Sequence, residues 1–265
     1  MKKVISTVIC IVLALLMALS IFMIVRHYSE EKQAADTYSD MQDFVVTEGT
    51  EGIESTESSG TEGTEPVVTP ETRPAQEEQT IAIDFDQLLA QYPNAVGWLY
   101  CEGTPINYPV MQSDDNDYYL RRLPDGTYNT AGSLFADYRC GKIGETNNYI
   151  IYGHNMKNGT MFSGLAQYKK QAYYDEHPTG LLITPEQTYQ IEFFAGYVAK
   201  VNDPAWDTGF ESDEDYEGWL QQAKDRSCFQ SLLSPAVTDR VLTLSTCSYE
   251  FDNARFVLLG ILKPL

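Results

Sequence analysis

Three side chains suited to nucleophilic and acid–base chemistry lie where predicted strands begin or end. Cys247 ends the apolar run 241–247, and His154 ends the run 148–154. Arg255 opens the last strand-like run of the chain, eight residues after Cys247. If the runs that carry Cys247 and Arg255 form a hairpin, both residues stand at the same end of one sheet. The sequence therefore predicts a thiol, an imidazole and a guanidinium at strand ends.

Each of these groups has a definite chemical use. A thiol has an ordinary pKa of about 8.5, so a cationic neighbour or a base is needed to form the thiolate at neutral pH. His154 can take that proton and later give one to a leaving amine. Arg255 is permanently charged and can hydrogen-bond an oxyanion or orient a peptide carbonyl. The combination favours covalent catalysis by the sulfur of Cys247.

The other cysteines and histidines have structural interpretations. We expect Cys101 and Cys228 to be small buried hydrophobic residues. For Cys140, in a predicted loop, the sequence does not decide between a buried and an exposed environment. His177 is expected at a helix end, where a surface role that complements the helix dipole is the usual one. The alternative for Cys247 is a cysteine that merely ends a strand. No spacing matches a metal-binding motif or a phosphate-binding loop, so we assign no metal and no cofactor.

Eight short strand-like runs surround these residues. They are rich in β-branched and aromatic residues, are bounded mostly by Gly, Pro, Asn or Asp, and cover residues 96–100, 106–111, 132–136, 149–152, 181–184, 189–201, 241–246 and 255–262. Helices are predicted at 85–92, 161–174 and 213–229, with Asp84 and Ser212 as N-terminal caps. Eight strands with few helices between them predict a mainly β fold, an antiparallel or mixed barrel.

The N-terminal region predicts a membrane anchor. Residues 4–25 form 22 positions without a charge, which at about 1.5 Å per residue span a hydrocarbon core. Lys2 and Lys3 precede this run, and a basic flank favours a cytoplasmic N-terminus with the remainder exported. We therefore expect residues 1–27 to be a cytoplasmic N-terminus and a transmembrane signal anchor. The alternative is a signal peptide cleaved near Ser20.

Charge divides the rest of the chain. Residues 28–80 hold 14 Asp or Glu and two Lys or Arg, which predicts an acidic disordered stalk. Residues 81–265 are long enough for a single catalytic domain with a sizeable core. Over the whole chain 18 Lys and Arg stand against 38 Asp and Glu, a net charge of −20, so we expect no nucleic-acid partner.

Three stretches resemble the sortases, the cell-surface cysteine transpeptidases of Gram-positive bacteria. They are Thr243-Leu244-Ser245-Thr246-Cys247, Tyr152-Gly153-His154 and Ala254-Arg255-Phe256-Val257. The similarity extends over about residues 85–262 and is greatest to class B. That class has an eight-stranded sortase-type β-barrel, a helix before it and a long helix between strands six and seven. The first and last of the predicted helices are placed accordingly.

The resemblance implies a reaction. The Cys247 thiolate would attack the carbonyl of Thr in a C-terminal sorting signal such as NPxTx, and His154 would protonate the departing amine. Arg255 would steady the tetrahedral oxygen or the substrate backbone. An amine of peptidoglycan would then resolve the thioester and join a surface protein to the cell wall. The implied location is the cell membrane, crossed once, with the catalytic domain extracellular.

The resemblance also implies weaker assignments. Asn107 and Ser245 match positions that line the class B substrate groove, and Tyr152 is expected to border it. Ser248 follows the cysteine where an acidic residue is usual. The string Asp203-Pro204-Ala205-Trp206 only loosely matches the lid motif of class C, so we expect no lid. Two alternatives stay open, namely an extracytoplasmic cysteine hydrolase of peptide or cell-wall bonds and a non-catalytic wall-binding module.

Overall fold

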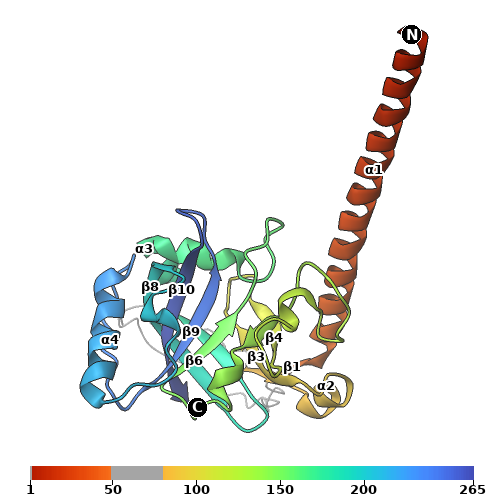
Figure 1. Cartoon of the computed structure of the whole chain (residues 1–265). Helices are drawn as coiled ribbons and strands as arrows, with labels where there is room; N and C mark the ends of the chain where they lie inside the picture. Colours follow the sequence, from red (N-terminus) through yellow and green to blue (C-terminus); the bar gives the residue numbers. More distant parts are fainter. Residues whose placement is uncertain (1, 49–79) are drawn as a thin grey trace, which may run out of the picture.

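Within residues 2–48 and 80–265, which the computed structural model describes, eight strands close into a barrel (Figure 1). In chain order they are β3 (Ala95–Tyr100), β4 (Asn107–Met111), β5 (Leu134–Ala136), β6 (Asn148–Tyr152), β7 (Thr179–Ile183), β8 (Thr188–Lys200), β9 (Arg240–Cys247) and β10 (Ala254–Pro264). Around the barrel the order is β10-β8-β7-β3-β4-β5-β6-β9. The pairs β4–β5 and β6–β9 are parallel and the other pairs are antiparallel, which confirms the predicted mixed barrel.

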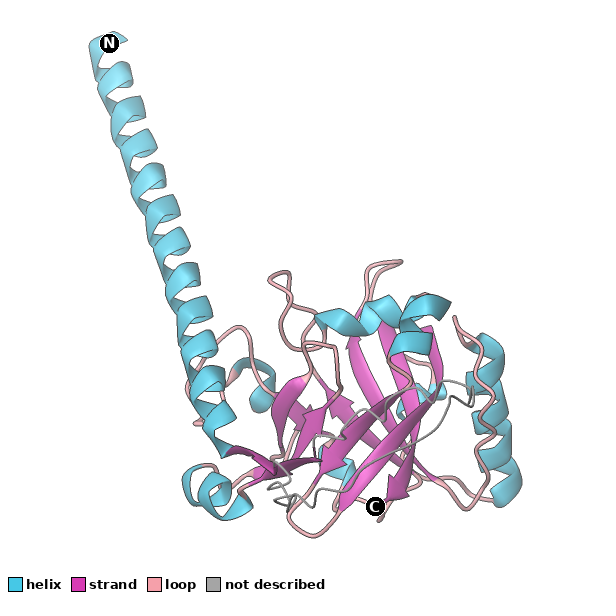
Figure 2. Cartoon of the chain, turned by 180° about the vertical axis from the view of Figure 1, so that it is seen from behind, coloured by secondary structure: helices cyan, strands magenta, loops and turns pink. Residues whose placement is uncertain are grey.

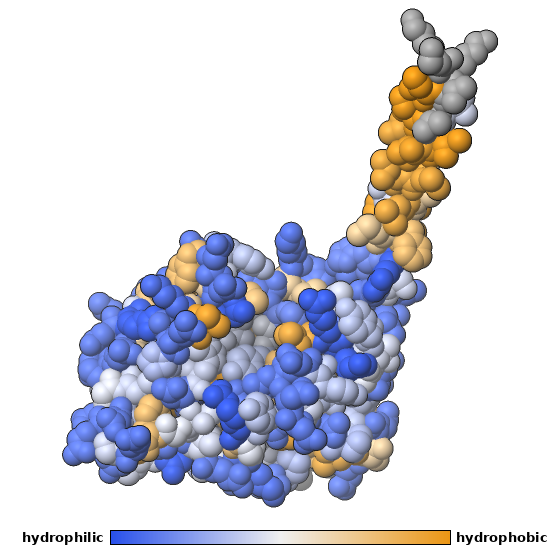
Figure 3. All heavy atoms as spheres, viewed as in Figure 1, coloured by the Kyte–Doolittle hydropathy of each residue, from blue (hydrophilic) through white to orange (hydrophobic). Residues whose placement is uncertain are grey.

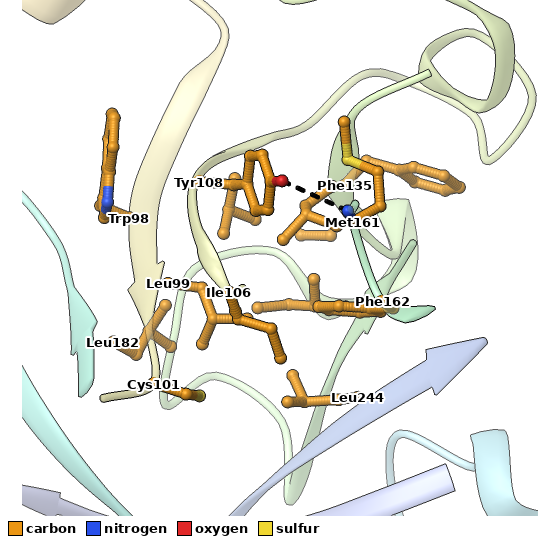
Figure 4. Close-up of a cluster of buried hydrophobic side chains, with 14 of the residues drawn as sticks. Trp98, Leu99, Cys101, Ile106, Tyr108, Phe135, Met161, Phe162, Leu182 and Leu244 are labelled. Atoms are coloured by element: carbon orange, nitrogen blue, oxygen red, sulfur yellow. Dashed lines mark hydrogen bonds between the residues drawn. The ribbon is translucent and has the colours of Figure 1, made fainter. Parts of the chain in front are cut away.

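Apolar side chains fill the barrel interior. Leu99 of β3 and Leu244 of β9 meet there with Phe162 from the segment after β6, and all three are fully buried (Figure 4). Full burial of a Leu or Phe side chain stabilises a fold by about 1.5–3 kcal/mol. At the edge of this cluster the Tyr108 hydroxyl accepts a hydrogen bond of 3.3 Å from the Met161 N–H. The interior is thus a packed core, and the ends and outer faces of the strands remain for chemistry.

Helix α4 (Asp213–Arg226) covers part of the outer surface of the barrel. Its apolar stripe, at three- and four-residue spacing, consists of Tyr216, Trp219, Leu220 and Ala223. This stripe joins Val257 and Leu259 of β10 in a second buried cluster. The Ser212 hydroxyl accepts a hydrogen bond of 3.1 Å from the Asp215 N–H, as predicted for the cap. Because α4 lies between β8 and β9, the sixth and seventh barrel strands, the predicted long helix is confirmed.

The two shorter predicted helices differ in outcome. Helix α2 (Phe85–Gln91) forms as expected, and the Asp84 carboxylate accepts from the Gln87 N–H at 3.0 Å. The single helix predicted at 161–174 is wrong. The chain instead forms a 3-10 helix, η4 (Ser163–Lys169), and then the short helix α3 (Gln171–Glu176). The buried residues Phe162, Leu165 and Tyr168 recur every three positions, which is the period of a 3-10 helix.

The prediction of a disordered stalk is wrong for residues 28–48. Helix α1 runs from Lys2 to Asp40, the 3-10 helix η1 (Met41–Phe44) follows, and strand β1 (Val45–Glu48) pairs with β2 (Thr80–Ile83) near the foot of α1 (Figure 2). Four side chains of this segment are buried in the main core, namely Ala34, Tyr38, Met41 and Phe44. The Tyr38 hydroxyl donates a 2.6 Å hydrogen bond to the Gly132 carbonyl. The rest of the predicted stalk, residues 49–79, lies outside the described residues.

The burial pattern explains this correction. The buried positions 34, 38, 41 and 44 are spaced by three and four residues, so one face of the helical segment packs while its charged residues face solvent. The first half of α1 is different. It is long and apolar enough to cross a membrane, and the side chains described there are exposed. It projects from the body as an almost wholly apolar rod (Figure 3).

Candidate active site

The barrel places Cys247 and Arg255 directly opposite each other. Cys247 is the last residue of β9, and its cross-strand partner in β10 is Arg255. The side chains of such a pair leave the same face of the sheet with Cβ atoms about 4.5–5.5 Å apart. The outer face of β9 also carries Ser245, whereas Leu244 faces the core. The predicted hairpin is confirmed, and the thiol lies at its open end.

A second strand brings His154 to the same place. Strand β6 runs parallel to β9, with Tyr152 opposite Ser245. Beyond the end of β6 the chain stays alongside β9, because the Thr246 hydroxyl donates to the Gly153 carbonyl at 2.8 Å. On the other side of His154, the Asn155 side-chain amide donates to the Cys247 carbonyl at 2.9 Å. His154 is thus held between two bonds to the segment that ends in Cys247.

The three side chains are not bonded to one another in this state. The His154 Nε2 lies 2.7 Å from the Leu120 carbonyl, and because a carbonyl only accepts, Nε2 must carry a proton. Nδ1 is therefore the nitrogen that can exchange protons. The Arg255 guanidinium donates to the Ala254 carbonyl at 3.0 Å. Within the described residues the Cys247 sulfur forms no hydrogen bond.

A pocket of about 620 Å³ opens at the thiol, formed by β9, β10 and the loop between them. It is lined by Cys247, Ser248, Tyr249, Glu250, Phe251, Asp252, Asn253 and Arg255. Lys169 of η4 fastens this loop, since its ammonium donates to the Ser248 hydroxyl at 3.2 Å and forms an ion pair with Glu250. The hydrogen bond from Lys169 lowers the pKa of Glu250 to about 2. The loop is therefore held by a charged contact that persists through neutral pH.

Burial separates Cys247 from the other cysteines of the barrel domain. Cys101 and Cys140 are fully buried, and burial raises the pKa of Cys101 to about 12 and also raises that of Cys140. The expected burial of Cys228 is wrong, because α4 ends at Arg226 and Cys228 is exposed. All the described cysteines are free thiols. Cys247 is the half-buried one, at a strand end and beside a guanidinium.

The three predicted substrate residues lie in different surroundings. Asn107, at the start of β4, accepts from the Trp98 indole at 2.6 Å and donates to Gln42 at 2.7 Å. It lines a separate cavity between α1 and the barrel and not the Cys247 pocket. Tyr152 is half-buried on β6, and Ser245 lies two residues before Cys247 but is only 2% exposed. The structure thus groups Ser245 and Tyr152 with the thiol and places Asn107 elsewhere.

Comparisons with known proteins agree with this arrangement. The model of the sortase domain family matches residues 99–262, more than half of the chain. The sortase B of Listeria monocytogenes is 39% identical over 167 residues, which is 62% of this chain and 68% of that protein. The chain belongs to the sortase family. Its relatives place it in class B, and a class B sortase is a cysteine transpeptidase.

Solved sortase B structures share its fold. The substrate complex of the Staphylococcus aureus enzyme has a TM-score of 0.65 at 32% identity, covering 68% of this chain and 85% of that one. The B. anthracis enzyme has a TM-score of 0.71 at 25% identity, covering 90% of this chain and all of that one. A sortase B has also been solved in complex with triglycine, with a TM-score of 0.65 at 33% identity, covering 68% of this chain and 86% of that one. The eight-stranded barrel with its preceding helix is therefore the class B fold.

Several residues around the site of this sortase were missed by sequence reasoning. Lys169 fastens the loop after Cys247, and Trp206 donates to the hydroxyl of Ser245 at 3.1 Å. The Asp137 carboxylate accepts from the Tyr152 hydroxyl at 2.8 Å and pairs with Arg139. Opposite charges two residues apart in 137–139 could have suggested the last contact. No sequence signal pointed to the other two.

Proposed function

We propose that this class B sortase cleaves a C-terminal sorting signal of the NPxTx type after its Thr and joins the Thr carbonyl to an amine of peptidoglycan. The proposal rests on the cross-strand pair of Cys247 and Arg255, with His154 held alongside by the bonds of its neighbours to β9. Sortase B structures solved with a substrate and with triglycine support an acyl donor and a small amine acceptor. The proposed partners are surface proteins that carry the signal.

In the first half-reaction the Cys247 thiolate forms a bond to the carbonyl carbon of Thr, and negative charge moves to the carbonyl oxygen. Arg255 would stabilise this oxygen by exchanging its hydrogen bond to Ala254 for one to the substrate. As the C–N bond breaks, the His154 imidazolium gives a proton to the departing amine. The product is a thioester between Cys247 and the cleaved protein.

In the second half-reaction the acceptor amine attacks the thioester carbonyl and passes a proton to His154. The C–S bond then breaks, and Cys247 leaves as a thiolate. One amide bond has been exchanged for another, so the reaction needs no cofactor. Because Nε2 of His154 is bound to the Leu120 carbonyl, Nδ1 is the atom assigned to both proton transfers.

The proposed setting is the outer side of the cell membrane. Residues 1–27 would form the cytoplasmic N-terminus and the transmembrane anchor, and residues 81–265 the catalytic domain. Residues 28–48 would form a segment of helix and one strand that packs on that domain. In Figure 1 the loop between β9 and β10 lies at the upper end of the barrel, the end toward which α1 rises. This arrangement would turn the Cys247 pocket toward the membrane that holds the uncleaved substrate.

The test uses the full chain in detergent micelles, an NPxTx peptide library and a choice of amines, with products read by mass spectrometry. We expect a thioester adduct and an amine-dependent ligated peptide. Both should disappear in Cys247→Ala and persist in Cys228→Ala, which removes the exposed thiol of the barrel domain. Cleavage that ignores every added amine would favour a hydrolase. An unchanged binding profile in Cys247→Ala, without any turnover in the wild type, would favour a binding module.

The roles of Arg255 and His154 have separate tests. Loss of one oxyanion donor typically lowers kcat by about 10²–10³, so Arg255→Ala should fall in that range. Arg255→Lys keeps the charge without the planar fork and should recover only part of the rate. His154→Ala should abolish turnover, whereas His177→Ala, at the end of α3, should not. Wild-type turnover in Arg255→Lys would show that the planar guanidinium of Arg255 is not needed.

A further inference from the structure

The connection between β8 and α4 is fastened to the outer face of the strands that carry the site. It contains the 3-10 helix η5 (Pro204–Trp206). The buried Asn148 amide of β6 donates to the carbonyls of Ala205 at 3.3 Å and Asp207 at 2.9 Å. The Thr243 hydroxyl of β9 donates to the Asn148 side-chain oxygen at 2.7 Å. Polar side chains on this face therefore serve to hold η5 in place.

Trp206 continues these contacts toward the catalytic cysteine. Its indole N–H donates to the Ser245 hydroxyl at 3.1 Å, and the indole is half-buried. Ser245 and Cys247 share the outer face of β9 and are about 6.6 Å apart along the strand, at 3.3 Å per residue. Ser245 is only 2% exposed, so its hydroxyl is covered, whereas the indole that donates to it keeps part of its surface exposed.

An ion pair between the exposed Arg139 and the buried Asp137 holds the other side of Trp206. Arg139 donates to the Trp206 carbonyl at 3.1 Å, and the same guanidinium binds the Asp137 carboxylate through Nε at 2.9 Å and Nη2 at 2.7 Å. Burial alone would raise the pKa of Asp137, but hydrogen bonds from Arg139 and Tyr152 bring it below its ordinary value. The carboxylate thus stays charged at neutral pH, and Trp206 is fixed at both its indole and its backbone.

We infer that Trp206 is a positioning residue for transpeptidation, which fixes the β8–α4 connection as a wall of the substrate groove beside Cys247. Ser245 acts on the substrate through Trp206, so the sequence-based assignment of Ser245 as a direct substrate contact is replaced by an indirect one. The inference rests on the proposed function, since it concerns how the same peptide reaches the thiol. It adds a residue to the reaction that touches neither the thiol nor the imidazole.

A double-mutant cycle on the full chain tests the inference. Trp206→Phe keeps a smaller aromatic ring and removes the N–H, and Ser245→Ala removes its acceptor. A single neutral hydrogen bond corresponds to about a two- to tenfold effect, so each variant should raise KM for the NPxTx peptide by that factor with kcat nearly unchanged. The double variant should be no worse than either single one. Additive effects would mean that Ser245 contacts substrate by itself and would overturn the inference.

Trp219→Phe is the matched control. The Trp219 indole N–H donates to the Pro204 carbonyl at 2.8 Å, so it holds the same connection from the side of α4. Trp219→Phe should lower the melting temperature about as much as Trp206→Phe does, but it should leave KM unchanged. If Trp219→Phe and Trp206→Phe raised KM equally, the effect would be general loosening of the connection, and the positioning role of Trp206 would be rejected.

Fluorescence quenching gives a readout that does not depend on variants of Trp206 folding. Trp98 is fully buried and Trp219 is 6% exposed, so acrylamide should quench mainly Trp206 among the three tryptophans. In full-length Cys247→Ala, which binds peptide without turnover, a saturating NPxTx peptide should reduce that quenching. Unchanged quenching would overturn the inference. An inactive wild type, by contrast, would refute the proposed function.

Discussion

Two segments pack on the outside of the barrel, and they serve it differently. The N-terminal segment, residues 30–48, contacts β4 and the turn before β5 through Tyr38 and Gln42. The connection that contains η5, with α4, packs on the strands that carry Cys247 and Arg255. No described residue of the first segment lines the Cys247 pocket. The N-terminal segment therefore completes the core, whereas the η5 connection also contacts the strands that carry the site.

Removal of the N-terminal segment gives the largest expected effect. A chain that begins at residue 81 lacks three large buried side chains, Tyr38, Met41 and Phe44, and leaves β2 without its partner. At about 1.5–3 kcal/mol for each side chain, the loss should be on the order of 5 kcal/mol. Urea unfolding should show this against a chain that begins at residue 28. Equal stability would mean that the segment does not pack in solution.

The two segments also differ in how well the sequence predicted them. In α4 the apolar stripe and the Ser212 cap both point to a helix, and both are found. The stripe at 34, 38, 41 and 44 has the same spacing, but the prediction for residues 28–80 used only their acidic composition. Charge averaged over a long window reports solvation. It does not report which face of a helical segment is buried.

The site was predictable to the extent that it depends on strand ends. Cys247, Arg255 and His154 each end or open a hydrophobic run, and the hairpin of β9 and β10 is local in sequence. The contact of Trp206 with Ser245 joins residues 39 positions apart and depends on how η5 packs. Asn107 was assigned by similarity, and its partner Gln42 lies in a segment predicted to be disordered. Such contacts follow from tertiary packing, which periodicity does not encode.

Matched core truncations sharpen the comparison. Met41 of the N-terminal segment is fully buried and Leu220 of α4 is 3% exposed, so each change to Ala should cost about 2–5 kcal/mol. Neither change should raise KM, because Trp206 keeps its own bonds to Ser245 and Arg139 in both variants. Chemical denaturation and steady-state kinetics on the full chain measure both quantities. A raised KM in Met41→Ala would show that the two segments are coupled.

The smallest expected effect concerns the loop after Cys247, which lines the Cys247 pocket. The pKa of Glu250 is lowered to about 2 by its bond to Lys169, so this pair stabilises the fold above the ordinary glutamate pKa and loses that contribution as pH falls toward 2. Both partners are partly exposed, which limits the contribution to about 1 kcal/mol or less. Glu250→Gln should therefore be slightly less stable than the wild type at pH 7, and the difference should shrink steadily in urea titrations below pH 4.

The control is Glu217→Gln, which changes an exposed glutamate of α4 that forms no ion pair within the described residues. It should show no such trend. If the stability difference between Glu250→Gln and the wild type instead grew as pH falls, the Lys169 contact would not hold the loop after Cys247.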